Sequence, residues 1–314
     1  MENDRHFKNL ISEFLNEFIL LFFPEWDPYL DCSSVVWLQK EQYNKPHEVP
    51  EISVCLVGLV KTDPSSPDYD MTPHVAIHIE CETGYSERSI NERIIEYQSV
   101  LFYVLEIPVL SIVLFQGMYL DGIGDIKTTN SFGSHTFMRS IVPYVAIGSL
   151  DGKTYLEQDN ILGVALAPLM RWPDGKMVYA NAEAMRKIAE SNLPDKKIAE
   201  LFSFVEAFQN FDEQQQIEYD AILEQNDYEK VGHMRKTSIE IGEEIGLKKG
   251  EAIGIEKGRQ QILRSIVMCL GIRKYGNPPL NVIFQVNSIS DLDRLYTMFD
   301  RIGTVSSWSE LLNP

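Results

Sequence analysis

The stretch HVAIHIECE, from His74 to Glu82, alternates between apolar and other side chains. Such alternation predicts a β-strand, because successive side chains of a strand point to opposite faces of its sheet. One face holds Val75, Ile77, Ile79 and Cys81. The other carries two carboxylates, Glu80 and Glu82, about 7 Å apart at their Cα atoms. We expect the first face to pack on helices and the second to border a cleft.

Further strands and a helix are expected on both sides of this stretch. Residues 51–60 (EISVCLVGLV) and 108–115 (PVLSIVLF) have the apolar character of buried strands, and residues 91–105 fit a helix. Other expected elements are a helix at 7–23 that Pro24 ends, a short strand at 35–41, and a strand at 140–148 that Pro143 weakens. The N-terminal half is therefore expected to be α/β.

Helical periodicity dominates beyond about residue 159. The expected helices are 159–171, 179–192, 195–209, 212–225, 260–275 and 290–301. This change of pattern predicts an α/β core over residues 1–150, a helical region packing on it over 151–230, a long helix over 231–268, and a small helical tail over 269–314.

Composition narrows the class of protein. The net charge is -18, and it is uneven: residues 1–230 hold 17 basic and 37 acidic residues, whereas residues 231–275 hold nine and five. A uniformly acidic surface would repel nucleic acid. The four cysteines form no CxxC pair, which argues against structural zinc. Without a secretory signal or an apolar run of about 18 residues, we expect a cytoplasmic protein that spans no membrane.

The strand at 51–60 is expected to form an antiparallel hairpin with the strand at 74–82. Pairing about a loop centred near residue 67 puts Glu51 opposite residue 83, beside Glu82 and diagonal to Glu80. Three converging carboxylates repel one another unless a cation, a proton or solvent relieves them, and hard oxygen ligands suit Mg²⁺ or Mn²⁺. The alternative is that these glutamates lie on an exposed sheet end.

Residues 238–262 contain an internal repeat with a glycine at every fourth position from Gly242 to Gly258. This spacing lets two helix backbones approach closely. Two interpretations stay open. Either a partner helix packs there, as in a coiled coil, and gives a homodimer, or the segment is a solvated, charge-laced linker helix.

Several segments, in order, resemble one family. These are FLNEFILLFFPEWDPYLD with VVWLQKE, then HVAIHIECE, ERIIEYQSVLFYVLEIPVLSIVLF and TYLEQDNILGVALAPLM, and then the Gly-Glu repeat with the 260–314 tail. Together the chain resembles the recombination-promoting nuclease/transposase family of the PD-(D/E)XK nuclease superfamily. The resemblance covers nearly the whole chain.

The resemblance implies a restriction-endonuclease-like mixed sheet flanked by helices, followed by an all-helical C-terminal region. It implies metal-dependent hydrolysis of phosphodiester bonds in double-stranded DNA, with Mg²⁺ or Mn²⁺ held by carboxylates. Glu80 matches the first acid of the family's E-x-Q/K pair, Glu51 stands where Asp is usual, and Glu41 matches a glutamate upstream.

Two positions depart from the family pattern. Glu82 stands where Gln or Lys would position water and offset charge, and Glu51 is one methylene longer than Asp. The expected chemistry is therefore a DNA endonuclease with an altered site, in which Glu82 is a third ligand or orients water. The alternative is a nuclease-derived, catalytically inactive oligomeric binding module.

Overall fold

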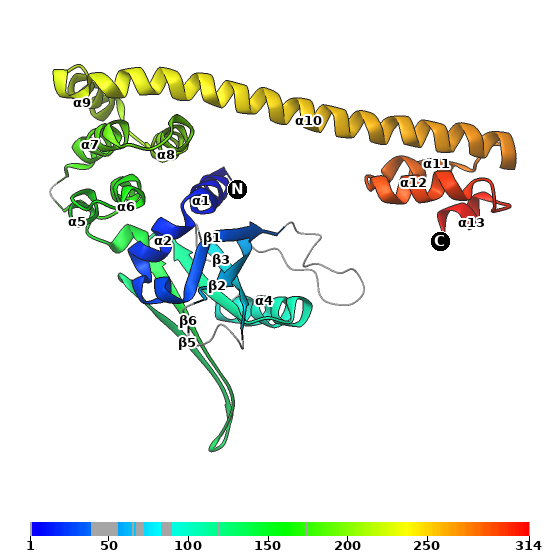
Figure 1. The fold of residues 1–314 in the computed structure, drawn as a ribbon, viewed down its shortest axis with the longest axis horizontal. Helices are drawn as coiled ribbons and strands as arrows, with labels where there is room; N and C mark the ends of the chain where they lie inside the picture. Colours follow the sequence, from blue (N-terminus) through cyan, green and yellow to red (C-terminus); the bar gives the residue numbers. More distant parts are fainter. Residues whose placement is uncertain are drawn as a thin grey trace. The chain divides into compact units, whose positions relative to one another are not determined.

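The computed structural model describes residues 2–38, 56–64, 66, 72–82, 90–118, 120–173 and 175–313. The chain divides into two compact units, Met1–Ile239 and Glu240–Pro314. The first unit is a mixed α/β structure and the second is helical (Figure 1). The finer division into four segments that the sequence suggests stays a prediction.

The first unit is built on one six-stranded sheet with strand order β1-β2-β3-β4-β6-β5. The strands are β1 (Leu30–Trp37), β2 (Leu56–Thr62), β3 (His74–Glu82), β4 (Val109–Phe115), β5 (Ile123–Phe132) and β6 (His135–Ala146). Strands β1, β2 and β3 pair antiparallel, and β4 lies parallel to both β3 and β6. The helix α4 (Ile90–Leu105) connects β3 to β4, as a parallel pair requires.

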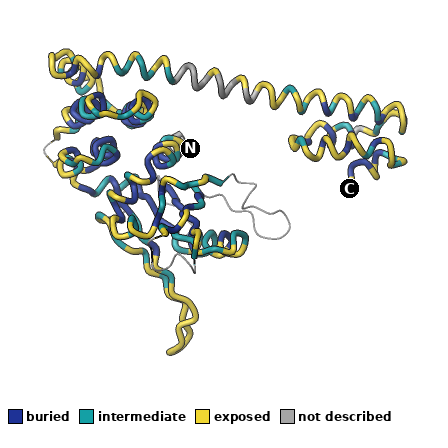
Figure 2. The backbone as a smooth tube through the Cα atoms, viewed as in Figure 1, coloured by how far each residue is buried: buried dark blue, intermediate teal, exposed yellow. Residues whose placement is uncertain are grey.

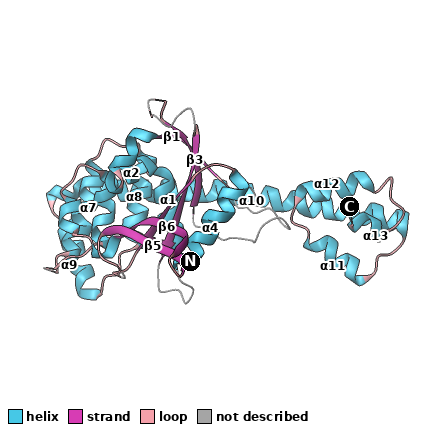
Figure 3. Cartoon of the chain, turned by 90° about the horizontal axis from the view of Figure 1, so that it is seen from below, coloured by secondary structure: helices cyan, strands magenta, loops and turns pink. Residues whose placement is uncertain are grey.

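Helices cover both faces of this sheet, on opposite sides of its strands (Figure 3). The helices α1 (Glu2–Glu13) and α2 (Leu15–Phe22) belong to the largest apolar core, which includes the apolar face of β3. Helix α4 packs on the other face through two smaller apolar clusters. The sheet is thus a central layer, which is why β4 is almost continuously apolar.

The remaining elements of the first unit are short helices that complete the larger core. They are η1 (Pro24–Tyr29), η2 (Ile147–Ser149), α5 (Gly152–Leu156), α6 (Ile161–Leu166), η3 (Ala167–Leu169), α7 (Met177–Glu190), α8 (Asp195–Ala207), α9 (Glu213–Leu223) and η4 (Asn226–Tyr228). Capping side chains begin three of them: Asp151 accepts from the Thr154 N–H at α5, Asn160 accepts from two backbone N–H groups of α6, and Asp212 forms a capping box with Gln215 at α9.

The helix α10 (Glu229–Tyr275) runs from the first unit into the second. The helices α11 (Leu280–Ser288), α12 (Leu292–Arg301) and α13 (Trp308–Leu312) pack on its C-terminal turns around a separate apolar core. None of the described helices is both long and apolar enough to cross a membrane. Figure 2 shows the buried residues gathered within each unit.

Most of the expected elements are confirmed, and the departures have local causes. The helix expected at 7–23 is interrupted at Phe14, whose backbone leaves the helical region. Pro143 lies inside β6, opposite Asp125 of β5 and one residue before the pairing with β4 begins at Tyr144. The helix expected at 260–275 is the end of α10, and α11 was not foreseen.

Two glycines of α10 give a matched test of the second unit's packing. A Cβ at Gly271 would overlap the Trp308 ring, whereas a Cβ at Gly258 meets nothing within 4 Å. We predict that Gly271→Ala destabilises residues 280–312 by about 1–3 kcal/mol through overpacking. Gly258→Ala should instead stabilise the helix by about 1 kcal/mol. Hydrogen exchange of peptides from α10 to α13 measures both, and equal protection of α11 to α13 in the two variants would contradict the packing.

Candidate carboxylate site

Glu80 and Glu82 lie at the carboxyl end of β3, where it runs parallel to β4. Glu80 is opposite Val113 and Glu82 is opposite Phe115. Both glutamates are only 7% exposed. The prediction that they project from the same face of the strand is consistent with their ion-pair contacts, because one arginine approaches both. Two buried carboxylates at the end of a parallel strand pair need a compensating charge.

Helix α4 covers this face of β3, so the expectation of an open cleft along it is wrong. His78 is fully buried there, with its Nδ1 2.9 Å from the Ser111 hydroxyl oxygen and its ring 5.9 Å from that of Tyr97. The alternating sequence pattern predicts which side chains of β3 share a face. It does not predict that α4 covers them.

Arg93 of α4 supplies the compensating charge. Its Nη2 contacts Glu82 Oε1 directly and lies 3.9 Å from Glu80 Oε1. The Arg93 side chain is 18% exposed, and both glutamate side chains are 9% exposed. One guanidinium on α4 therefore faces two carboxylates on β3. The formal net charge of these three side chains is -1.

Sequence reasoning missed Arg93 as a site residue, although a signal was present. Arg93 and Tyr97 are four residues apart, which places them on one face of α4 a single turn apart. Both side chains meet β3, Arg93 at the two glutamates and Tyr97 at His78. The spacing of Arg93 and Tyr97 on the helix after β3 could suggest that both side chains face that strand. Only the fold shows that Arg93 meets the two glutamates.

Three buried nitrogens of this cluster make no hydrogen bond among the described residues: His78 Nε2, Arg93 Nε and Arg93 Nη2, of which Nη2 forms the ion pair with Glu82. Glu80 Oε2 lies 3.6 Å from His78 Nε2, which is an electrostatic contact beyond hydrogen-bond length. Buried polar atoms are nearly always paired, so unpaired donors or acceptors are enriched where a protein binds or reacts with something. The cluster therefore combines acidic groups with unused hydrogen-bonding capacity.

The other two predicted ligands, Glu41 and Glu51, lie outside the described residues. The antiparallel pairing of β2 with β3 is confirmed, but its register differs from the expected one by a residue. Leu56 lies opposite Ile79 rather than His78. The convergence of Glu51 on Glu80 stays a prediction.

The described residues do not by themselves form a metal centre. No group of three or more His, Cys, Asp and Glu side chains among them is arranged to hold an ion. Glu80 and Glu82 offer oxygen donors of the kind that Mg²⁺ and Mn²⁺ take, but Arg93 occupies Glu82.

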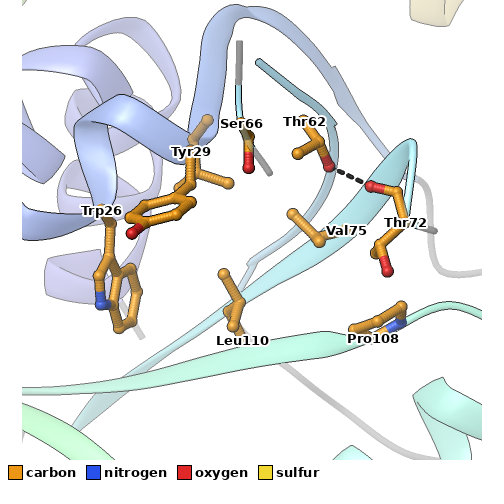
Figure 4. Close-up of a pocket in the computed structure, with 9 residues that line it drawn as sticks. Trp26, Tyr29, Thr62, Ser66, Thr72, Val75, Pro108 and Leu110 are labelled. Atoms are coloured by element: carbon orange, nitrogen blue, oxygen red, sulfur yellow. Dashed lines mark hydrogen bonds between the residues drawn. The ribbon is translucent and has the colours of Figure 1, made fainter. Parts of the chain in front are cut away.

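A separate cavity of about 440 Å³ lies on the opposite face of the sheet, toward the start of β3 (Figure 4). Trp26, Tyr29, Val75 and Leu110 contribute to its largely apolar wall, and the Thr62 hydroxyl donates to the Thr72 carbonyl at its rim. None of the described residues that line it is charged. Its chemistry suits an apolar group and gives no acid or base for hydrolysis.

The Arg93–Glu82 contact can be tested by its effect on stability. Arg93→Met leaves two buried carboxylates without their cation, and we predict a loss of about 3 kcal/mol in unfolding free energy. Adding Glu82→Met should restore part of this loss, with an interaction energy of about 1–3 kcal/mol between the two positions. Urea unfolding followed by tryptophan fluorescence measures each variant.

Arg171→Met is the matched control, because Arg171 is exposed and should change stability by no more than about 0.5 kcal/mol. Simple additivity of Arg93→Met and Glu82→Met would show that the two side chains do not stabilise each other.

Comparison with models of known protein families gives no match for this chain. Comparisons with curated proteins and with solved structures give none either.

Proposed function

We propose that this chain is a metal-dependent DNA endonuclease with an altered carboxylate site, related to the recombination-promoting nuclease/transposase family. The observation that carries the proposal is the buried cluster of Glu80, Glu82 and Arg93 at the carboxyl end of β3. A strand end that keeps two carboxylates out of water, beside nitrogens without partners, is costly as structure alone. Such groups are retained more readily where they react or bind.

The architecture supports the same proposal. The resemblance implies a mixed sheet flanked by helices with the site at a sheet edge, and the chain has a mixed sheet with helices on both faces. Glu80 and Glu82 stand at the carboxyl end of a central strand, next to the segment where β2 pairs with β3. A restriction-endonuclease-like identity for this sheet is part of the proposal.

In this proposal the carboxylates of Glu80, Glu51 and Glu41 hold Mg²⁺ or Mn²⁺. The ion, when bound, lowers the pKa of a water molecule and stabilises charge on the leaving oxygen of the phosphodiester. Glu82, which the sequence also places among the ligands, has Arg93 as its described partner. Glu82 then orients Arg93, and through that contact holds the guanidinium within reach of Glu80.

Arg93 takes over the charge compensation that the family assigns to Lys or Gln at position 82. That position is acidic in this chain, so the cation comes from α4 instead of from β3. The guanidinium has donors beyond those that meet the glutamates, and its Nε has no described partner.

The second candidate is a binding module that has lost its chemistry. The excess of 20 acidic residues within residues 1–230 favours it, because such a surface repels DNA at most positions. The homodimer expected through residues 238–262 would serve either function and stays a prediction. In that helix Gly254 and Gly258 meet no other part of the chain, and the side chains of several residues between 242 and 253 lie outside the described part.

The endonuclease proposal is tested by nicking of a supercoiled plasmid with the full chain in Mn²⁺ or Mg²⁺. We predict that Glu80→Gln lowers the nicking rate by about two orders of magnitude, because a metal-binding carboxylate becomes a neutral amide. Glu157→Gln, which removes an exposed carboxylate elsewhere in the unit, should leave the rate unchanged.

A thermal scan separates the two candidate functions. If Mn²⁺ raises the melting temperature of the wild type and not of Glu80→Ala, the ion binds at this cluster. Metal binding with no nicking would favour the binding module, and a metal-independent melting temperature with no nicking would remove the endonuclease.

A further inference from the structure

The strands β5 and β6 extend beyond the sheet as a two-stranded arm. Strand β6 pairs with β4 only through Tyr144, Val145 and Ala146, whereas β5 and β6 pair with each other along their whole length. The segment from Ile126 to Val142, here called the arm, projects away from the body of the unit (Figure 1). Almost all of it is exposed (Figure 2).

The arm keeps large apolar side chains in solvent. Phe132 is 80% exposed, Phe137 is 69% exposed and Ile141 is 55% exposed. A lone two-stranded ribbon is marginal in water, and apolar groups gathered on it are typical of a surface that a partner covers. The exposed apolar side chains of the arm are thus better explained by contact with a binding partner than by a contribution to the stability of the free chain.

Both cations of the arm lie on one of its faces. Thr129 pairs with Arg139 and Lys127 pairs with Ile141, so these four side chains share a face. The other face is half-buried near its base, where Ile126 and Val142 belong to the cluster under α4. The cationic face is therefore the one that a partner can reach.

The arm is also unusual in charge. No Asp or Glu occurs between Asp125 and Asp151, which is the longest such interval within residues 1–230. That part of the chain has a net charge of -20. The arm instead carries Lys127, Arg139 and His135 among Ser, Thr and Asn side chains. Asp125 lies at its base, 3.9 Å from the Lys127 ammonium group.

We propose that the arm binds in a groove of duplex DNA. Its two strands are about 4.8 Å apart, and a two-stranded ribbon fits the major groove, about 12 Å wide. Lys127 and Arg139 contact phosphates, the hydroxyl and amide groups meet base edges or sugars, and Phe132 at the tip supplies the apolar contact. This inference rests on the proposal that DNA is the substrate, and it identifies the arm as the surface that binds the DNA.

A second copy of the chain is a weaker candidate for the same surface. Strand β5 is the edge of the sheet, and a register shift between Asn130 and Ser131 together with the exposed Lys127 disfavours strand addition. Two such arms brought face to face would also oppose like charges.

The experiment is fluorescence anisotropy of a labelled 30-base-pair duplex with the full chain, in EDTA, at several salt concentrations. We expect Lys127→Ala with Arg139→Ala to weaken binding roughly tenfold and to reduce the salt slope by about two. The matched control is Lys153→Ala with Lys230→Ala, which removes two exposed cations outside the arm and should change affinity less than twofold. Phe132→Ser should weaken binding without changing the salt slope.

The proposal is overturned if the wild type does not bind the duplex at low salt, or if arm and control variants weaken binding equally. It is also overturned if Phe132→Ser alters the mass of the particle in light scattering while DNA affinity stays the same, since the arm would then join copies of the chain. Because EDTA removes cleavage from the measurement, the anisotropy assay reports on binding by the arm, whereas the nicking assay reports on Glu80. A failure of the endonuclease and a failure of the arm are therefore distinguishable.

Discussion

The contact of Arg93 with Glu82 is the constraint on which the first unit depends. Taking two carboxylates out of water costs several kcal/mol each unless a cation and good hydrogen bonds offset the loss. Only α4 brings a guanidinium to that end of β3 in the described part of the chain. The sheet can therefore bury Glu80 and Glu82 only while α4 is packed against β3. Undocking of α4 and exposure of the two carboxylates to water are thus coupled.

The sequence could predict this unit's strands better than its site. Alternation in His74–Glu82 predicted β3 to the residue and separated its two faces. Local patterns carry no information about which distant helix covers a face, so the cleft was wrong and Arg93 was missed as the partner. The β5 strand was missed because it is exposed on most of its length and has no apolar run to mark it. The register of β2 was off by one residue, since loop length alone does not fix pairing.

Charge explains how an acidic chain could act on DNA. With a net of -20 over residues 1–230, the average surface opposes a phosphate backbone, and the buried acidic cluster adds to that field. Affinity then has to come from a local surface where acids are absent and cations project from the body. The arm has these properties, and under the proposal its reach would separate the phosphate contacts from the repulsion of the carboxylates.

Helix α4 joins the two parts of this proposal. Arg93 holds Glu82, and the next residue, Ile94, belongs to the apolar cluster that contains Val142 and Ile126 at the base of the arm. Neighbouring residues of one helix thus fix both the carboxylates and the root of the ribbon. Since Ile94 is fully packed, a rotation of α4 that released Arg93 would also disturb the arm. A chain that binds DNA through the arm and reacts at Glu80 would keep the two at a fixed spacing by this means, without a separate hinge or domain contact.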